Sequence, residues 1–599
     1  MRTLLHFFLF MMTINLIQLY VEAIPVQSRC DEDQQSLLLR LKETLIFDSS
    51  DSSKLIYWNS STNCCSWAGV SCSDGLVVGL DISGEYISGG IDNSSILFDL
   101  QHLQSLNLAN NYDSTHSQIP SAIGRLTNLK YLNLSANAYF GQIPIEISHL
   151  TKLVTLDLSG NVMGLELENP NLSMLIQNLT ELTELYLDGV SISSAHGARW
   201  SQAISSSLPN LKVLRLYSCN ISGPIHQSFA KLQSLSVLLL DQNDISAPVP
   251  GFFANFSSLT SLSLSSCNLY GTFSEKIFQI TTLQKVDLSS NPRLQGSLPE
   301  FLNNGSLQSL ALSGSKFSGF LPKSIGNLKM LSTLDLSGCS FTLSIPNSVA
   351  NLTQLNFLDI SSNSFNSSID SIHWENLVNL EVLKLDSNLL HGSIPLSLFS
   401  LPVLWNLVLS QNQFYGQLPE FANISSNLLY TLDLSGNHLE GPIPTSIFNL
   451  RGLQELRLSS NHFSGFPFNG PQQPKNFSIL DLSNNSLLID YNGSSPTSSS
   501  FLQINYLFLS SIKLRAFPDF LRNQSTLAYL DLSENKIQGE IPNWIWKLNS
   551  LLTLNLSYNS LATLQGPLHN LTSTVAALDL RSNNLQGKIP ILSFPTYLD

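Results

Sequence analysis

Leucine recurs along the chain with a spacing of about two dozen residues. The pattern L-x-x-L-x-L-x-x-N begins at Leu103 and continues to residue 594. Positions 1, 4 and 6 are apolar and the positions between them are mostly polar, which predicts a short strand with one buried and one solvent-facing side. Twenty repeats begin at Leu103, Leu129, Leu153, Leu182, Leu211, Leu235, Leu259, Leu283, Leu307, Leu331, Leu355, Leu380, Leu404, Leu429, Leu453, Phe477, Ile504, Leu527, Leu551 and Val575.

A single repeat of this length buries too little apolar surface to offset the ordering of its own backbone, so the repeats must stack. The pattern is that of a leucine-rich repeat. We therefore predict an α/β repeat solenoid, a right-handed leucine-rich-repeat superhelix with a parallel β-sheet on its concave side.

The ninth position of the pattern is usually asparagine. An amide both donates and accepts hydrogen bonds, so an asparagine here satisfies buried backbone groups and predicts a ladder along the array. Three cysteines stand at this position, namely Cys219, Cys267 and Cys339. They are separated by whole multiples of 24 residues, which places them several strand spacings apart and favours ladder substitutes over a disulfide or a metal site. Val190, Ser315 and Ile512 interrupt the ladder.

The second half of most repeats reads G-x-I-P or a close variant. Glycine permits a tight backbone and proline ends local strand pairing, which predicts the convex side of the solenoid. Inserts lengthen two repeats, near residues 162–181 and 191–210. The motif occurs at residues 141–144, 296–299, 392–395, 416–419, 441–444, 539–542 and 587–590.

Residues 1–23 begin with a basic Arg2, continue as an apolar stretch and end on Val21-Glu22-Ala23. This is typical of a signal peptide. A membrane anchor is the alternative, but polar residues interrupt the stretch. In a secretory context the N-x-S/T sequons become candidate glycan sites. Seventeen occur, at Asn59, Asn93, Asn133, Asn171, Asn178, Asn220, Asn255, Asn304, Asn351, Asn366, Asn423, Asn476, Asn484, Asn492, Asn523, Asn555 and Asn570.

Residues 24–76 predict an N-terminal cap, and residues 77–102 a first irregular capping repeat. The cap begins with an amphipathic helix that has Asp31 or Asp33 near its N-cap. A bond between the adjacent Cys64 and Cys65 would be strained, which leaves two possible connectivities. The four cysteines of the cap are Cys30, Cys64, Cys65 and Cys72. Disulfides here would cover the apolar end of the array.

The net charge of −14 and the lack of any Lys/Arg cluster give no footprint for nucleic acid. No nucleotide-binding, hydrolase, zinc-peptidase or kinase motif occurs, so we expect no enzyme, no cofactor and no metal. His438 and His462 each follow a ladder asparagine 24 residues apart. They should stack on neighbouring repeats, and a polar edge position is favoured over a pH switch or a metal pair.

Ligands of a solenoid generally meet the solvent-facing positions of its strands. Exposed tyrosine, tryptophan and arginine are the side chains that dominate binding energy. Departures from the polar consensus form two candidate ligand-binding clusters, one of Tyr186, Arg215, Tyr217, Leu239 and Asp241 and the other of Lys384, Asp386, Trp405 and Val408. An acidic row also recurs in the L-D-L-S repeats, including Asp157, Asp335 and Asp433, where a solvated face is favoured over a site for a basic ligand.

The cap, the G-x-I-P repeats and the strings ENPNLS, LYLDGV and IPNWIW together resemble the plant leucine-rich-repeat receptor-like proteins, most closely those of the Verticillium wilt disease resistance type. The resemblance implies disulfides Cys30–Cys64 and Cys65–Cys72. It also implies an extracellular array that binds a pathogen-derived protein or peptide and signals through a receptor-kinase adaptor and co-receptor. Members of that family carry a C-terminal membrane span, which would place the protein at the plasma membrane facing the apoplast.

Residues 595–599 read as the start of a further, truncated repeat, so we expect a truncated ectodomain, secreted if no span follows. Two alternatives share the architecture. One is a secreted leucine-rich-repeat inhibitor of microbial cell-wall-degrading enzymes, similar to the polygalacturonase-inhibiting proteins. The other is a developmental peptide receptor.

Overall fold

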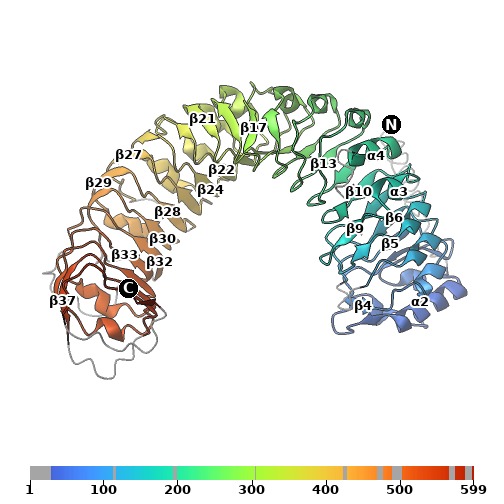
Figure 1. The fold of residues 1–599 in the computed structure, drawn as a ribbon, viewed down its shortest axis with the longest axis horizontal. Helices are drawn as coiled ribbons and strands as arrows, with labels where there is room; N and C mark the ends of the chain where they lie inside the picture. The colour runs from blue at the N-terminus through green and yellow to red at the C-terminus, as the bar shows by residue number, and fades with distance from the viewer. Residues whose placement is uncertain are drawn as a thin grey trace, which may run out of the picture. The chain divides into compact units, whose positions relative to one another are not determined.

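The computed structural model describes residues 29–111, 117–192, 199–303, 305–421, 428–467, 476–488, 502–565, 574–586 and 597–598. The chain divides into two compact units, Met1–Asn268 and Leu269–Asp599. Within each unit, successive turns of the chain stack side by side (Figure 1). The signal peptide predicted for residues 1–23 lies outside the described residues.

The cap begins with helix α2 (Glu32–Thr44), where the sequence predicts a helix. Its N-cap is Asp31, whose carboxylate accepts hydrogen bonds from the backbone N–H groups of Asp33 and Gln34 at 3.0 and 3.3 Å. One face of α2 buries Leu38 and Leu41. Two disulfides hold the cap, Cys30–Cys64 and Cys65–Cys72, in the pairing that the family resemblance implies.

Short strands and turns complete the cap. Strand β2 (Val70–Ser73) pairs antiparallel with β3 (Leu76–Asp81), which gives the parallel sheet an antiparallel edge. Strand β1 (Ile46–Phe47) pairs antiparallel with β4 (Ile87–Gly89). The 3-10 helices of this region are η1 (Leu55–Tyr57), η2 (Cys64–Ser66) and η3 (Ile96–Asp99).

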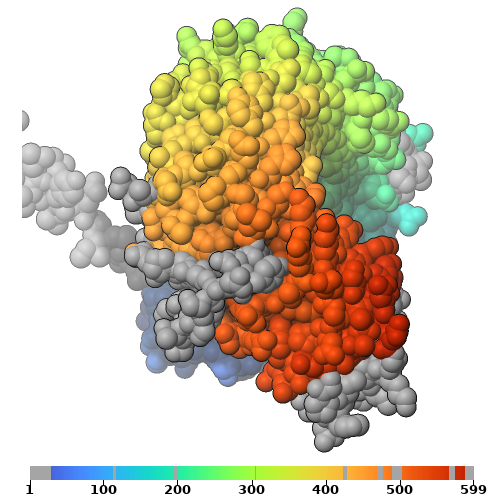
Figure 2. All heavy atoms as spheres, turned by 90° about the vertical axis from the view of Figure 1, so that its left-hand side faces the viewer, coloured from blue at the N-terminus to red at the C-terminus, as the bar shows by residue number. Residues whose placement is uncertain are grey.

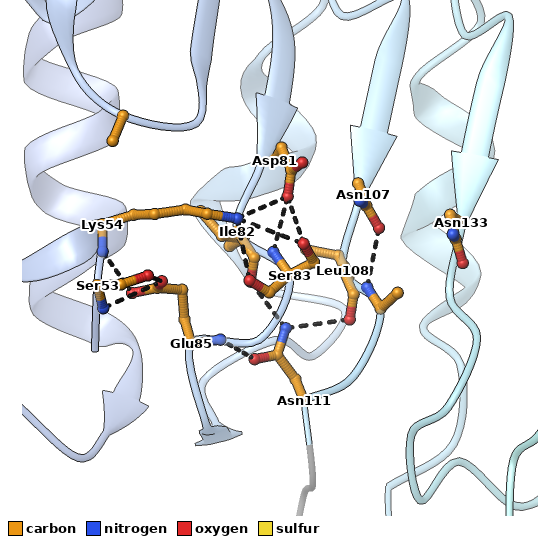
Figure 3. Close-up of polar contacts among 12 residues, drawn as sticks. Ser53, Lys54, Asp81, Ile82, Ser83, Glu85, Asn107, Leu108, Asn111 and Asn133 are labelled. Atoms are coloured by element: carbon orange, nitrogen blue, oxygen red, sulfur yellow. Dashed lines mark hydrogen bonds and ion pairs between the residues drawn. The ribbon is translucent and has the colours of Figure 1, made fainter. Parts of the chain in front are cut away.

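A buried carboxylate joins the cap to the first repeat (Figure 3). Glu85 accepts hydrogen bonds from the Ser52 hydroxyl at 2.5 Å and from the backbone N–H groups of Lys54 and Leu55 at 3.0 and 3.1 Å. Burial of Glu85 opposes its ionisation, but these hydrogen bonds hold its pKa below the ordinary value. The Glu85 N–H in turn donates to Asn111 at 3.0 Å, so the first ladder asparagine is tied to the cap.

The parallel sheet of the first unit contains one short strand per repeat. Each three-residue strand has a buried central leucine, as its apolar spacing predicts, and the leucines of neighbouring strands lie in register. After β3 the strands are β5 (Ser105–Asn107), β6 (Tyr131–Asn133), β8 (Thr155–Asp157), β10 (Glu184–Tyr186), β12 (Val213–Arg215), β13 (Val237–Leu239) and β14 (Ser261–Ser263).

The second unit repeats the arrangement, and its repeats form one continuous surface from orange to red in Figure 2. Leu598 pairs with Leu578, which places it at the fourth position of a further repeat. The strands are β16 (Lys285–Asp287), β18 (Ser309–Ala311), β20 (Thr333–Asp335), β22 (Phe357–Asp359), β24 (Val382–Lys384), β26 (Asn406–Val408), β28 (Thr431–Asp433), β30 (Glu455–Arg457), β32 (Asn476–Asp481), β33 (Gln503–Phe508), β34 (Tyr529–Asp531), β36 (Thr553–Asn555), β38 (Ala577–Asp579) and β39 (Tyr597–Leu598).

Additional short parallel sheets follow the ladder turns, where the hydrophobic pattern predicts no strands. Proline follows β7 and β27 two and three residues after the strand, but the glycine of the G-x-I-P motif is itself a strand residue, with Gly141 and Gly416 at φ 75° and 88°. The sheets are β7 (Gly141–Gln142), β9 (Leu165–Leu167) and β11 (Ser191–Ile192); β15 (Tyr270–Thr272), β17 (Arg293–Gly296), β19 (Lys316–Gly319), β21 (Ser340–Leu343) and β23 (Ser364–Phe365); β25 (His391–Gly392), β27 (Gln413–Gly416), β29 (His438–Pro442) and β31 (His462–Gly465); and β35 (Gln538–Ile541) with β37 (Ser560–Leu564).

Most repeats then form one turn of 3-10 helix after the proline, because proline fixes φ and lacks an N–H that would need a partner. The two inserts instead contain α-helices, α3 (Leu172–Ile176) and α4 (Arg199–Ser207). The 3-10 helices are η4 (Ser121–Arg125), η5 (Ile145–His149), η7 (Gln227–Lys231), η8 (Gly251–Asn255), η9 (Glu275–Gln279), η10 (Lys323–Asn327), η11 (Asn347–Asn351), η12 (Trp374–Asn376), η13 (Leu396–Ser400), η14 (Thr445–Asn449), η15 (Asp519–Asn523) and η16 (Ile545–Lys547).

The asparagine ladder connects each repeat to the one before it. Asn243 donates to the carbonyls of Leu216 and Leu240, both at 2.7 Å. Its side-chain oxygen accepts from the N–H groups of Cys219 and Ile221 at 3.0 and 3.1 Å. Buried backbone groups of two repeats are therefore paired by one amide.

The ladder cysteines use the same carbonyl of the preceding repeat as the asparagines do. The thiols donate from Cys219 to Leu187 at 3.0 Å, from Cys267 to Leu240 at 3.0 Å and from Cys339 to Leu312 at 3.2 Å. None of the three forms a disulfide. Burial raises the pKa of Cys219 and of Cys339, which keeps these thiols protonated.

Candidate binding face on the parallel strands

The strand face consists of the residues on either side of each buried central leucine, together with the residues at the strand ends. In β10 and β12, for example, Leu185 and Leu214 are buried while the flanking residues are half-buried. Each repeat therefore presents a few side chains to a ligand, held in fixed register by the sheet.

The first candidate cluster centres on Arg215. Register places Tyr186, Arg215 and Leu239 side by side on β10, β12 and β13. The Arg215 guanidinium lies 2.5 Å from the Asp188 carboxylate and 5.8 Å from the centre of the Tyr186 ring. An arginine so placed is oriented by an ion pair and a cation–π contact together.

Tyr186 is fixed from its other end by Glu184, which accepts a hydrogen bond from the phenol at 3.2 Å. Partial burial, together with the charge of Glu184, raises the pKa of Tyr186 to about 12. The phenol therefore stays neutral at physiological pH.

Two features of this cluster bear on ligand binding. Tyr217 is 41% exposed. The Arg215 Nε atom is buried and has no hydrogen-bond partner among the described residues. An aromatic surface thus lies near a donor that needs an acceptor.

Asp241 is not available, contrary to its assignment as a ligand contact. Its Oδ1 atom accepts from the Ser263 hydroxyl at 2.5 Å and from the Ser265 N–H and hydroxyl, both at 2.8 Å. The side chain is buried against the next repeat. Asp241 therefore stabilises the stacking of repeats and is removed from the candidate cluster.

The second candidate cluster lies on β22, β24 and β26. Register places Asp359, Lys384 and Val408 side by side, and the Lys384 ammonium lies 3.6 Å from the Asp359 carboxylate. Burial and the negative charge of Asp359 raise the pKa of Asp386. Because of its ion pair with Asp359, the Lys384 ammonium is already partly neutralised within the protein.

Trp405 precedes β26 and is 43% exposed. Beside it in the chain, the buried Oδ1 atom of Asn406 accepts no hydrogen bond among the described residues. This cluster thus pairs an exposed indole with an acceptor that needs a donor.

The acidic row of the L-D-L-S repeats serves the turns that follow the strands. Asp157 accepts from the N–H and the hydroxyl of Ser159 at 2.9 and 2.6 Å. Asp335 and Asp433 bind Ser337 and Ser435 in the same way. These half-buried carboxylates therefore hold the turns in place through one oxygen each.

Sequence reasoning missed three residues of the strand face: Glu184, Asp188 and Asn406. Asp188 stands within the LYLDGV string, at the position after the third apolar residue, where most other repeats have serine. A carboxylate at this position, with an arginine on the next strand, could have predicted the ion pair between Asp188 and Arg215. No feature of the sequence singles out Asn406.

The candidate glycan sites differ in exposure. Half-buried side chains belong to Asn133, Asn171 and Asn555, and exposed ones to Asn59, Asn93, Asn178, Asn220, Asn255, Asn351, Asn366, Asn484 and Asn523. Outside the described residues lie Asn304, Asn423, Asn492 and Asn570, as does the side chain of Asn476.

Known family models match both the N-terminal cap and the repeats. Residues 31–73 match the leucine rich repeat N-terminal domain. Residues 101–163, 202–269 and 502–561, and further single repeats at 306–328, 330–352 and 428–450, match leucine rich repeat models. The chain is a leucine-rich-repeat protein. The match to the cap and the parallel sheet together confirm the predicted fold class.

This leucine-rich-repeat protein is related to plant receptor-like proteins. It is 33% identical to Receptor-like protein 6 of Arabidopsis thaliana over 325 residues, which cover 51% of this chain and 28% of that protein. It is 32% identical to Receptor-like protein Cf-9 of Solanum pimpinellifolium over 322 residues, covering 50% of this chain and 31% of that protein. The matched segment thus spans less than a third of either relative.

Among solved structures, the leucine-rich-repeat ectodomain of the Arabidopsis receptor kinase HAESA, bound to an extended IDA peptide hormone, is similar at 28% identity and a TM-score of 0.74. The similarity covers 93% of this chain and 94% of that one. PEPR1 bound to AtPEP1 is similar at 25% identity and a TM-score of 0.57, over 94% and 87% of the two chains. The array is therefore similar to the non-enzymatic ectodomains of plant receptors, and this kinship implies an extracellular or secretory location.

The helices of the described segments are short. The longest, α2, has 13 residues, and no helix in this part of the chain combines the length and apolarity needed to cross a bilayer.

Proposed function

We propose that the chain is the extracellular ligand-recognition array of a plant receptor-like protein and that it binds a protein or peptide on its strand face. The observation that carries the proposal is the state of two clusters on that face. Each combines an exposed aromatic side chain with a polar atom that has no partner within the described protein. Tyrosine, tryptophan and arginine are the side chains enriched in binding hot spots.

The chemistry of the two clusters suits a peptide main chain. The buried Arg215 Nε is an unpaired donor two residues before Tyr217, and the buried Asn406 Oδ1 is an unpaired acceptor next to Trp405 in the chain. A backbone carbonyl would satisfy the first and a backbone N–H the second, while the aromatic rings would cover apolar side chains. Because leaving a buried polar atom unpaired is costly, the ligand would recover that cost on binding.

We further propose a role in pathogen perception, with defence signalling through partner receptor kinases. The resemblance to receptor-like proteins of the Verticillium wilt disease resistance type supports this role. HAESA has been solved with both the IDA hormone and the co-receptor SERK1, which supports a co-receptor for the present array as well. In this proposal the protein acts at the plasma membrane facing the apoplast, or as a secreted protein.

A receptor for an endogenous peptide is the second candidate. It is favoured by the similarity to HAESA, which extends over 93% of this chain and includes a bound peptide hormone. The two candidates share the strand face and differ in the source of the ligand.

The proposal is tested by panning a phage-displayed library of random dodecapeptides against the secreted, purified chain. Peptides that bind the strand face should lose at least tenfold in affinity with Tyr217→Ala or Trp405→Ala, since each removes an exposed aromatic anchor. Tyr415→Ala is the matched control, because Tyr415 is 57% exposed but lies on β27, a strand of the additional short sheets and not of the strand face.

Enriched peptides whose affinity is unchanged by both aromatic variants, or equally changed by the control, would contradict binding at the strand face. Competition then separates the two candidates. A fungal culture filtrate that displaces the peptide supports pathogen perception, whereas displacement by leaf apoplastic fluid alone supports an endogenous ligand.

A further inference from the structure

A cavity of about 600 Å³ lies on the turns that follow the strands of five successive repeats of the second unit. It is separate from the strand face, and the proposed function does not use it. Its lining includes the residue directly after the ladder position in each of the five repeats, namely His438, His462, Ser486, Lys513 and Lys536. We call these five residues the turn row.

The two histidines begin the turn row. Their imidazole rings stack at the start of β29 and β31, with centroids 6.1 Å apart and planes inclined by 10°, as their 24-residue spacing predicts. Neither ring has a hydrogen-bond or ion-pair partner within the described segments. Their polar edges are therefore available to a ligand.

The two lysines end the row. Ile512 replaces the ladder asparagine of its repeat, and the next residue, Lys513, has a φ of 65°. The Lys513 ammonium donates to the Ser486 hydroxyl at 3.3 Å. Lys536 follows Asn535 one repeat later, and no partner of its ammonium is found in the described part of the chain.

The charge of the lining is opposite to that of the whole protein. The chain has a net charge of −14, yet the cavity is lined by two lysines, two histidines and one carboxylate, Glu534. Imidazoles ordinarily gain a proton between pH 8 and 5. Two lysines thus face a single carboxylate in this recess, and any proton gained by an imidazole adds to the positive potential there.

The spacing of the row indicates the shape of the ligand. Adjacent strands lie about 4.8 Å apart, so four spacings extend the row over about 19 Å. A volume of about 600 Å³ is typical of a small-molecule site and far exceeds that of one inorganic anion. We propose that the turn row binds an extended small polyanion bearing two or more carboxylate, sulfate or phosphate groups, more tightly at pH 5.5 than at pH 7.5.

Binding is measured by isothermal titration calorimetry of the full secreted chain at low salt. Tripolyphosphate and citrate serve as probes with several charged groups of different chemistry, and acetate serves as a singly charged probe. Both polyanions should bind at least tenfold more tightly than acetate, since each engages several cations. Preference for one polyanion identifies the group that the site recognises; equal affinity for all three probes would overturn the proposal.

Charge variants test the site itself. The double variant Lys513→Gln and Lys536→Gln should weaken tripolyphosphate binding at least tenfold. Glu534→Gln should strengthen binding severalfold, a gain that loss of folding cannot mimic. Lys316→Gln and Lys323→Gln together form the matched control, because they remove two charges from the same unit outside the cavity. Equal weakening in this control would overturn the proposal.

The pH dependence tests the histidines. Affinity at pH 5.5 should exceed that at pH 7.5 at least fivefold, and His438→Gln with His462→Gln should abolish this difference. Two titratable groups face the rings from neighbouring strand positions, Tyr415 beside His438 and Glu440 beside His462. Glu440→Gln should keep the pH dependence; if it removes the dependence instead, the imidazoles are not its source and that part of the proposal fails.

One candidate glycan site lines the cavity, and a glycan attached there would block it. Asn484 lies in its lining and donates to the Ser460 hydroxyl at 3.2 Å. Mass spectrometry of the secreted chain should therefore find Asn484 unglycosylated, and full occupancy by a glycan would overturn the proposal. Tyr217→Ala and Trp405→Ala should leave polyanion binding unchanged, which separates this site from the strand face.

Discussion

The side-chain oxygen of Asn243 accepts a hydrogen bond from the backbone N–H of Cys219 at 3.0 Å, across the boundary between two repeats. The same amide donates to two buried carbonyls. Asn243→Ala leaves these groups unpaired, and we expect it to lower the free energy of unfolding by about 2 to 4 kcal/mol. Thermal and urea unfolding followed by circular dichroism measures the change.

Asn210→Ala is the control for the ladder variant. Asn210 is exposed and makes one hydrogen bond, to the Thr180 carbonyl at 3.1 Å. Asn210→Ala should change the free energy of unfolding by less than about 0.5 kcal/mol. Equal effects of the two variants would show that the ladder adds nothing beyond an ordinary surface contact.

The ladder thiol of Cys219 should be unreactive in the folded protein. Burial, followed by the nearby negative charge of Asp188, raises its pKa and disfavours the thiolate that alkylating reagents attack. Iodoacetamide labelling at pH 8.5, read by peptide mass spectrometry, should leave Cys219 unmodified in native protein and modify it in urea. Native labelling at the rate of a small free thiol would contradict a buried ladder position.

Glu85 should make the junction between cap and first repeat sensitive to acid. Its pKa in the folded protein is below the ordinary 4.5, so the ionised carboxylate stabilises the fold above that pH and the stabilisation is lost as the pH falls through the lowered value. Glu85→Gln should cost about 1 to 3 kcal/mol at pH 7, because charged hydrogen bonds are lost. Hydrogen exchange of the segment around residues 52–58 at pH 7, 5 and 3.5 measures both effects.

Glu43→Gln provides the comparison, since Glu43 is an exposed residue of α2. In Glu43→Gln, the backbone amides around residues 52–58 should exchange at the wild-type rate at all three pH values. If Glu85→Gln instead keeps the wild-type loss of protection on acidification, another group controls the acid sensitivity.

Tyr186 should ionise late in an alkaline titration. Its pKa is raised to about 12 by partial burial and by Glu184, so its phenolate absorbance should appear well after that of exposed tyrosines. Glu184→Gln should move this late step towards pH 10, and Tyr186→Phe should remove it. Burial and the charge of Asp531 also raise the pKa of Tyr529, so the titration is made in a Tyr529→Phe background, where a late step that survives in Tyr186→Phe would contradict the assignment.

Much of the repeat architecture follows from local pattern. The spacing of leucines predicts the strands, and the period predicts their parallel register, because a 24-residue repeat brings each leucine beside its equivalent. The N-cap of α2 follows from an aspartate before an apolar face. The additional short sheets were missed because each strand has only two to five residues and gains its partner only when repeats stack.

The binding face could be predicted only in part. Strand periodicity places Tyr186, Arg215 and Lys384 correctly among the solvent-facing positions. It does not reveal that Asp241 turns towards the serines of the next repeat, or that Asp188 holds Arg215. These contacts depend on side-chain direction at the strand ends, where the alternation of the strand no longer applies.

The sequence alone determined the repeat, its buried positions and the role of Cys267, since a residue at a fixed place in a repeating pattern inherits the hydrogen bonds of that place. Only the tertiary structure decided which polar side chains of the strand face are already paired and which turns enclose a cavity. The reason is physical: period fixes where a backbone lies, whereas pairing and cavities depend on the side chains that successive repeats bring together.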